Sequence, residues 1–217
     1  MSPNNYPDIN RMWENAQKIC SISEQEFRAF QASCLARQKF VPKIGEPAPD
    51  FDLPEMSLTG EMTGRTVKLS SLLGHPVALA FGSYTCPTFR GAVEIFNEIY
   101  SKYAPAVTFY AIYIWEAHPD DGWCSPKNLT AKIAIAKPKT YEDKITAAAK
   151  LRNLSGLKLP LLIDDFDNSC EEKYIAHPHR LFVIDQQGLV SYVQGLGSRN
   201  FRPDDWAKAI KEISNNS

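Results

Sequence analysis

The feature that most constrains the fold is an uncharged run at residues 76–82, PVALAFG, which passes directly into a short polar turn and a helix-forming segment. Such a run is typical of a strand buried on both faces of a sheet. Residues 88–104 then carry large apolar side chains at helical spacing, and residues 107–115 form a second apolar run. We therefore predict a parallel βαβ unit with residues 76–82 as a central strand.

The second half of the chain has a different pattern. Thr140 and Asp143 form a capping box that opens a helix, and a short strand follows at residues 161–163. Residues 181–184 and 189–193 flank a turn and predict an antiparallel hairpin, with a last helix over residues 203–214. This order, βαβ and then ββα, predicts an α/β thioredoxin-like fold with a central mixed sheet flanked by helices.

The N-terminal segment is predicted to be a separate helical extension over residues 1–41, followed by the thioredoxin-like domain over residues 42–217. Apolar residues share one helix face from Ile9 to Ala16, and Ser23 with Glu26 forms a capping box. Four prolines then favour extended backbone over residues 41–54. The loop over residues 116–139 is rich in Pro, Asp and Gly and is either a functional loop or an insertion.

Composition limits the partners. The net charge of −1 over 217 residues gives no positive electrostatic field that would attract nucleic acid. No segment has the pattern of a signal peptide or of a membrane span. We expect a cytoplasmic protein without nucleic-acid or membrane partners. The five cysteines form no C-x-x-C pair and no metal-ligand spacing, so we expect free thiols, no metal and no bound cofactor.

Cys86 is the candidate nucleophile, because it lies between the buried strand and a helix with Pro87 in its first turn. A helix N-terminus favours thiolate over thiol, so we predict a lowered pKa for Cys86. Ser83 and Thr85 would supply hydroxyls to the sulfur or to a substrate. The alternative is that Cys86 is a small core residue.

A family resemblance rests on FGSYTCPTF at residues 81–89 and YIWEAHPDDGW at residues 113–123. These segments resemble the iodothyronine deiodinases, thioredoxin-fold relatives of peroxiredoxins that carry selenocysteine where this chain has Cys86. The resemblance covers roughly residues 76–214, and residues 44–51 are similar to the entry strand of peroxiredoxins.

The resemblance implies that Cys86 is the catalytic nucleophile, with Thr85 and Ser83 as polar neighbours and Glu116 and His118 as an acid/base pair. The strand order agrees, since Cys86 and the 116–118 loop would both follow carboxyl ends of neighbouring parallel strands. The alternative for His118 is a structural role in capping a turn.

Substrate-binding candidates flank these residues. Tyr84, Pro87 and Phe89 surround the cysteine in the sequence, and His179 occupies the place where thioredoxin relatives face the nucleophile. The register is uncertain by one residue, so Pro178 or Arg180 is an alternative to His179. A cluster of His177, His179 and Arg180 would favour an anionic group, unless it is a solvated loop.

The chain also departs from the family pattern. Cysteine in place of selenocysteine implies slower dehalogenation. Lys137 to Lys139 replace a histidine, and Leu196 replaces an arginine, that help hold iodothyronine in the family, which weighs against thyroid hormone as the substrate.

Cys124 and Cys170 are candidate resolving thiols for an oxidised Cys86, with Cys124 preferred because it follows the His118 loop. Cys20 and Cys34 lie on apolar helix faces and are interpreted as packing residues.

Three functions compete. The first is reductive dehalogenation of an iodinated aromatic substrate through Cys86, with an external thiol as reductant. The second is a peroxiredoxin-like thiol peroxidase, although the P-x-x-x-T-x-x-C spacing is absent because Thr85 directly precedes Cys86. The third is a non-catalytic binding protein. Deiodinases are dimers, so the N-terminal helices are predicted to cover a homodimer interface.

Overall fold

The structure, a computed structural model, describes residues 8–215. Within them, seven strands form one mixed sheet in the order β2-β1-β5-β4-β3-β6-β7. The strands are β1 (Asp52–Met56), β2 (Met62–Lys68), β3 (Val77–Gly82), β4 (Thr108–Tyr113), β5 (Leu161–Ile163), β6 (Arg180–Ile184) and β7 (Val190–Val193).

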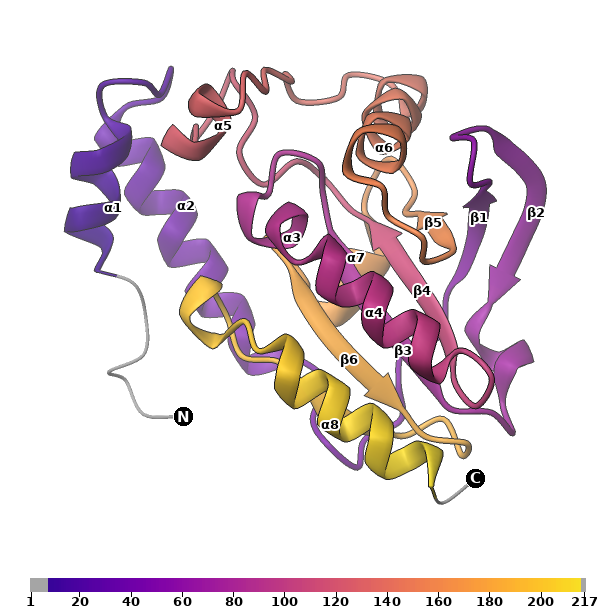
Figure 1. Cartoon of the computed structure of the whole chain (residues 1–217). Helices are drawn as coiled ribbons and strands as arrows, with labels where there is room; N and C mark the ends of the chain where they lie inside the picture. Colours follow the sequence, from indigo (N-terminus) through magenta and orange to yellow (C-terminus); the bar gives the residue numbers. More distant parts are fainter. Residues whose placement is uncertain (1–7, 216–217) are drawn as a thin grey trace.

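Helices lie on both faces of the sheet (Figure 1). The α-helices are α1 (Ile9–Ala16), α2 (Glu24–Arg37), α3 (Pro87–Gly91), α4 (Val93–Tyr103), α5 (Pro126–Thr130), α6 (Tyr141–Ser155), α7 (Ser169–Tyr174) and α8 (Pro203–Ser214). The short 3-10 helices are η2 (Gln38–Phe40), η3 (Leu69–Leu72) and η4 (Ser198–Asn200). None of the helices within residues 8–215 combines the length and the apolar character that a bilayer crossing requires.

The predicted thioredoxin-like arrangement is confirmed. Strand β3 is buried along its whole length and pairs in parallel with β4, while β6 pairs with β3 and with β7 in antiparallel fashion. The capping boxes of α2 and α6 form as predicted. The boundary after residue 41 stays a prediction.

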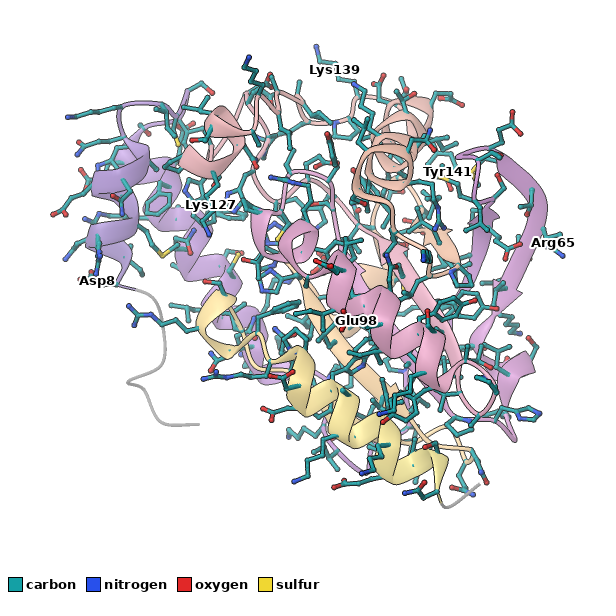
Figure 2. The ribbon with its side chains drawn as sticks, viewed as in Figure 1. Asp8, Arg65, Glu98, Lys127, Lys139 and Tyr141 are labelled. Carbon is teal, nitrogen blue, oxygen red and sulfur yellow. The ribbon has the colours of Figure 1, made fainter. Side chains whose placement is uncertain are left out.

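Two apolar cores cover the two faces of the sheet. One contains Phe96 of α4, Leu151 of α6 and Trp206 of α8, and the other contains Phe81 of β3 and Tyr174 of α7. Charged side chains such as those on Arg65, Glu98 and Lys139 lie on the outside (Figure 2). Helices α4 and α8 lie side by side on one face, with α7 behind the sheet (Figure 1).

The structure corrects or adds to the predicted elements in four places. The helix predicted over residues 88–104 is split at Ala92, which separates α3 from α4. The predicted loop over residues 116–139 contains α5, and the β1–β2 hairpin and α7 were not foreseen. The split matters for the site because α3 is a separate short helix that begins at Pro87, with Cys86 as its N-cap residue.

Candidate active site

Cys86 and His179 are in direct contact at the carboxyl end of β3. Cys86 is the N-cap residue of α3 and is 1% exposed, and its Sγ lies 3.2 Å from Nδ1 of His179. The sheet register creates this contact, because Phe81 of β3 pairs with Arg180 of β6 and so places His179 beside the end of β3. His179, rather than Pro178 or Arg180, therefore faces the sulfur.

The predicted lowering of the Cys86 pKa is wrong for the resting site. Burial raises the pKa of the Cys86 thiol to about 11, although the backbone N–H groups of Phe89 and Thr88 act in the opposite direction. Helix α3 has only five residues, so its dipole is small. Burial also lowers the pKa of His179 to about 3. At neutral pH the pair is therefore a thiol whose S–H donates to a neutral imidazole.

Ser83 and Thr85 bind the backbone of the neighbouring loop. The Ser83 Oγ accepts the backbone N–H of Ala117 at 3.0 Å, and the Thr85 Oγ1 accepts that of His118 at 3.0 Å. Both side chains are buried. Both hydroxyls therefore satisfy buried backbone N–H groups of the 117–118 loop, and their predicted contact with Cys86 or with a substrate stays a prediction.

Glu116 also acts on the backbone of the cysteine loop. Its carboxylate accepts the Thr85 backbone N–H at 2.9 Å and the hydroxyl of Tyr113, and the Tyr113 oxygen in turn accepts the Tyr84 N–H at 3.2 Å. Burial raises the pKa of Glu116. In the described part of the chain no hydrogen bond joins Glu116 to His118, so the structure does not assemble them as an acid/base pair.

His118 lies at the edge of the same site. Its Nδ1 is 3.2 Å from the Trp123 carbonyl oxygen, and its ring meets the Trp123 ring edge-on at a centroid distance of 4.3 Å. Burial lowers the pKa of His118 to about 4, so the ring is neutral at pH 7. Since a carbonyl only accepts, Nδ1 carries the proton and Nε2 is left as an acceptor.

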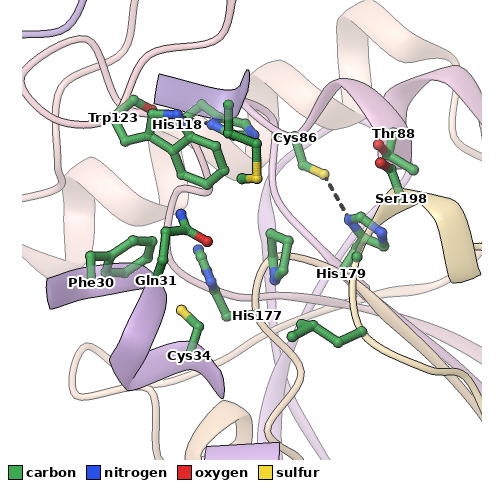
Figure 3. Close-up of a pocket in the computed structure, with 14 residues that line it drawn as sticks. Phe30, Gln31, Cys34, Cys86, Thr88, His118, Trp123, His177, His179 and Ser198 are labelled. Atoms are coloured by element: carbon green, nitrogen blue, oxygen red, sulfur yellow. Dashed lines mark hydrogen bonds between the residues drawn. The ribbon is translucent and has the colours of Figure 1, made fainter. Parts of the chain in front are cut away.

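A pocket with a volume of about 100 Å³ opens beside Cys86 (Figure 3). Figure 3 shows Cys86 and His179 together on one side, His118 and Trp123 on a second side, and His177 on a third, beside residues of α2. The pocket is lined by Met12, Phe30, Gln31, Cys34, Cys86, Thr88, His118, Trp123, His177, Pro178, His179, Leu196, Gly197 and Ser198. Both N-terminal helices thus contribute to its wall.

Two predicted substrate-binding residues are core residues instead. Phe89 is buried over Gly82, where an added Cβ would lie 2.2 Å from a Phe89 ring carbon. Arg180 donates to the carbonyls of Ile175 and Gln194 and to Gln38 of η2. Phe89 therefore anchors α3, and Arg180 holds the N-terminal extension, because their contacts point away from the pocket.

Tyr84 and Pro87 also lie outside the pocket lining. The Arg90 guanidinium lies over the Tyr84 ring, 5.5 Å from its centroid, and Pro87 forms the first turn of α3. These contacts place both residues in the support of the cysteine loop. Their predicted role in substrate binding stays a prediction.

The structure reassigns the other thiols. The Cys124 side chain faces loop carbonyls, and the Cys20 Sγ accepts the Cys124 backbone N–H at 3.0 Å. Cys170 is buried in the core on the far face of the sheet. Cys34, interpreted from the sequence as packing, lines the pocket with Cys86. Cys124 is therefore placed as a partner of Cys20 rather than of Cys86.

The wall supplied by the extension was missed from the sequence. Phe30 contacts the rings of Trp115, Trp123 and His177 at centroid distances of 5.9, 6.2 and 5.5 Å. Its only sequence signal was a place on the apolar face of a predicted helix. That signal does not distinguish a core residue from a pocket residue.

Comparisons of the sequence with known proteins identify its family. The sequence matches the profile of the family described as iodothyronine deiodinase over residues 7–213. It is 30% identical over 169 residues to a type I iodothyronine deiodinase from Xenopus laevis, covering 78% of this chain and 63% of that protein. It is 32% identical over 159 residues to a thyroxine 5-deiodinase from Gallus gallus, covering 73% of this chain and 58% of that one. The chain thus matches about three fifths of the length of these relatives.

Solved structures support the fold. A putative thiol:disulfide interchange protein DsbE from Chlorobium tepidum superposes with a TM-score of 0.55 at 21% identity, covering 80% of this chain and 99% of that chain. A putative protein disulfide isomerase from Bacteroides thetaiotaomicron gives a TM-score of 0.55 at 21% identity, covering 81% and 92% of the two chains. With the fold, the cysteine loop and the family profile in agreement, this chain belongs to the iodothyronine deiodinase family.

Proposed function

We propose that this protein removes iodide reductively from an aromatic substrate, with Cys86 as nucleophile and His179 as its base. The observation that carries the proposal is the 3.2 Å contact between Cys86 Sγ and His179 Nδ1 at the wall of a pocket. Family membership and the names of the relatives, a type I iodothyronine deiodinase and a thyroxine 5-deiodinase, support this reaction class.

The chemistry begins with a proton transfer within the pair. His179 takes the Cys86 proton as the sulfur attacks iodine, so charge separation stays inside one hydrogen-bonded pair and burial opposes it less than it opposes a lone thiolate. The carbon–iodine bond breaks, a sulfur–iodine bond forms, and the ring carbon keeps the electron pair. The imidazolium of His179 then returns the proton to that carbon, giving Ar–H and a sulfenyl iodide on Cys86.

An external thiol completes the cycle in this proposal. One thiol displaces iodide from Cys86 and forms a mixed disulfide, and a second thiol releases Cys86 by thiol–disulfide exchange. The net reaction converts Ar–I and two thiols into Ar–H, iodide, a proton and one disulfide. We also propose a reducing compartment such as the cytoplasm, because the cycle consumes thiols.

The test is an iodide-release assay with dithiothreitol, offering thyroxine, 4-iodophenol and hydrogen peroxide in parallel. We expect iodide release by the wild type and none by Cys86→Ser. Consumption of hydrogen peroxide with no iodide release from either aromatic compound would replace the proposal with thiol peroxidase chemistry. Ligand binding that survives Cys86→Ser without any turnover in the wild type would indicate a binding protein.

We propose in addition that the N-terminal helices cover a homodimer interface. Phe40, the last residue of the short helix η2 that follows α2, is 66% exposed, and Leu35 on α2 is 39% exposed. Such apolar side chains are candidates for burial between two copies. Light scattering coupled to size exclusion tests this, and a strict monomer at all concentrations would contradict it.

A further inference from the structure

His177 lines the pocket but has no role in the proposed reaction. Its side chain is buried, with 3% of the residue exposed, and it lines the pocket with Cys86. The ring stacks on Trp115 at a centroid distance of 3.9 Å and an interplanar angle of 19°, and Phe30 meets it edge-on at 5.5 Å. The backbone N–H donates to the Glu171 carboxylate at 2.9 Å. The ring is therefore held in one orientation.

Neither ring nitrogen of His177 has a hydrogen-bond partner among the described residues, and both nitrogens are buried. A buried polar atom without a partner costs free energy, which a ligand that completes the hydrogen bond recovers. Figure 3 shows the ring directed toward the pocket, between residues of α2 and the side that carries Cys86. The ring nitrogens therefore mark a place for a polar group of the ligand.

The chemistry of the pocket limits which polar group fits. Burial lowers the pKa of His177 well below its usual range, so the ring is neutral and offers one N–H donor and one acceptor nitrogen. A hydroxyl group has the same pair of functions. None of the described residues that line the pocket is Asp, Glu, Lys or Arg, and Leu196 lies in the wall. A carboxylate or an ammonium group would therefore be desolvated there without a counter-charge.

The predicted anionic site is corrected by the same facts. Arg180 points away from the pocket, and the two histidines of that cluster are neutral. The pocket volume of about 100 Å³ is smaller than the cavity of about 150 Å³ that accepts benzene, so this pocket, which opens to solvent, has room for no more than one aromatic ring. Size and charge together favour a small, uncharged ligand.

We propose that His177 binds the hydroxyl group of an uncharged, single-ring iodophenol whose iodine faces Cys86. The position of the iodine in this inference rests on the proposed deiodination, whereas the position of the hydroxyl rests on the pocket residues alone. It makes His177 a determinant of substrate specificity, distinct from the Cys86–His179 pair that performs the chemistry. The rings of Phe30 and Trp123, which line the same pocket, would contact the aromatic ligand.

The test uses Cys86→Ser protein, so that binding is measured without turnover. Binding of 4-iodophenol, iodobenzene and 4-iodophenylacetate is followed by quenching of tryptophan fluorescence, because Trp123 lines the pocket. We expect 4-iodophenol to bind roughly tenfold more tightly than iodobenzene, the effect of one buried hydrogen bond, and 4-iodophenylacetate to bind most weakly.

His177→Phe, made in the same background, should remove the preference for 4-iodophenol and leave iodobenzene binding unchanged. His177→Gln, which keeps a donor and an acceptor, should retain part of the preference. The matched control is His75→Phe, since His75 is exposed and lies outside the pocket lining. The preference for 4-iodophenol over iodobenzene is measured in the parent protein, so it stands whether or not His177→Phe folds.

Equal binding of 4-iodophenol and iodobenzene, an unchanged preference in folded His177→Phe, or tightest binding of 4-iodophenylacetate would each overturn the inference. Iodide release by the wild type is a separate measurement. Its absence would remove the proposed reaction, whereas the three binding outcomes decide the role of His177.

Discussion

Replacement of His179 by Gln tests the central contact of the site. A thiol with the pKa of about 11 that burial gives Cys86 is ionised in roughly one molecule in 10⁴ at pH 7. His179 avoids this limit because Nδ1, 3.2 Å from Sγ, takes the proton as the sulfur reacts. Since a general base contributes about 10²- to 10⁴-fold, we expect His179→Gln to slow alkylation of Cys86 by that factor at pH 7.

The pH dependence makes this prediction sharper. The pKa values of about 3 for His179 and about 11 for Cys86 both lie outside the range from pH 6 to pH 9. The protonation state of the wild-type pair therefore stays the same over this range, and its alkylation rate should be nearly constant. In His179→Gln the rate should follow the thiolate fraction and rise by about tenfold per pH unit.

The assay is mass-spectrometric mapping of the Cys86 peptide after timed reaction with iodoacetamide. His118→Gln is the matched control, because His118 lines the same pocket but its ring bonds to the Trp123 carbonyl and not to Cys86. A rate in His179→Gln within roughly threefold of wild type, with the same pH dependence, would refute the role of His179 as base.

Three further predictions concern stability and redox state. Gly82→Ala places a Cβ 2.2 Å from the Phe89 ring and should lower the free energy of unfolding by about 1–3 kcal/mol in urea titrations. In the control Gly91→Ala the added Cβ has no atom within 4 Å and should leave the free energy nearly unchanged, so equal midpoints would contradict the packing argument. A low-molecular-weight disulfide should oxidise Cys20 and Cys124 to an intramolecular disulfide with release of two thiols, because the Cys20 sulfur lies 3.0 Å from the Cys124 backbone nitrogen. A peptide map that shows Cys86 linked to Cys124 instead would support the resolving role. Burial lowers the pKa values of the pocket histidines below their values in the unfolded chain, so the unfolded state binds more protons between pH 6.5 and about 4. The free energy of unfolding should be full above pH 6.5 and fall as the pH drops, by up to about 1.4 kcal/mol per pH unit for each histidine. Urea midpoints that do not change from pH 7 to pH 5 would contradict this.

The elements that were predicted correctly carry local signals. Strand β3 is a continuous apolar run, α2 and α6 begin at capping boxes, and α8 begins at Pro203. Each signal acts between residues a few positions apart, so it can be read without the rest of the chain. The cysteine motif was found for the same reason.

The elements that were missed depend on tertiary contacts. Strands β1 and β2 contain Pro54 and several charged residues, and β1 is stabilised by pairing with β5. Helix α7 has six residues, too few to be stable alone, and its side chains Cys170 and Tyr174 are fixed by burial in the core. Local propensity therefore gave no reliable signal for either segment.

The sequence by itself determined the βαβ unit around the central strand, the C-terminal hairpin and helix, and the placement of Cys86 at a strand–helix junction, because all three follow from local patterns. Only the tertiary structure decided that His179 contacts the sulfur, that the hydroxyls of Ser83 and Thr85 serve the backbone, and that Cys124 lies against Cys20. Those outcomes depend on strand register, on the depth of burial and on contacts between residues up to 104 positions apart, and no local pattern encodes them.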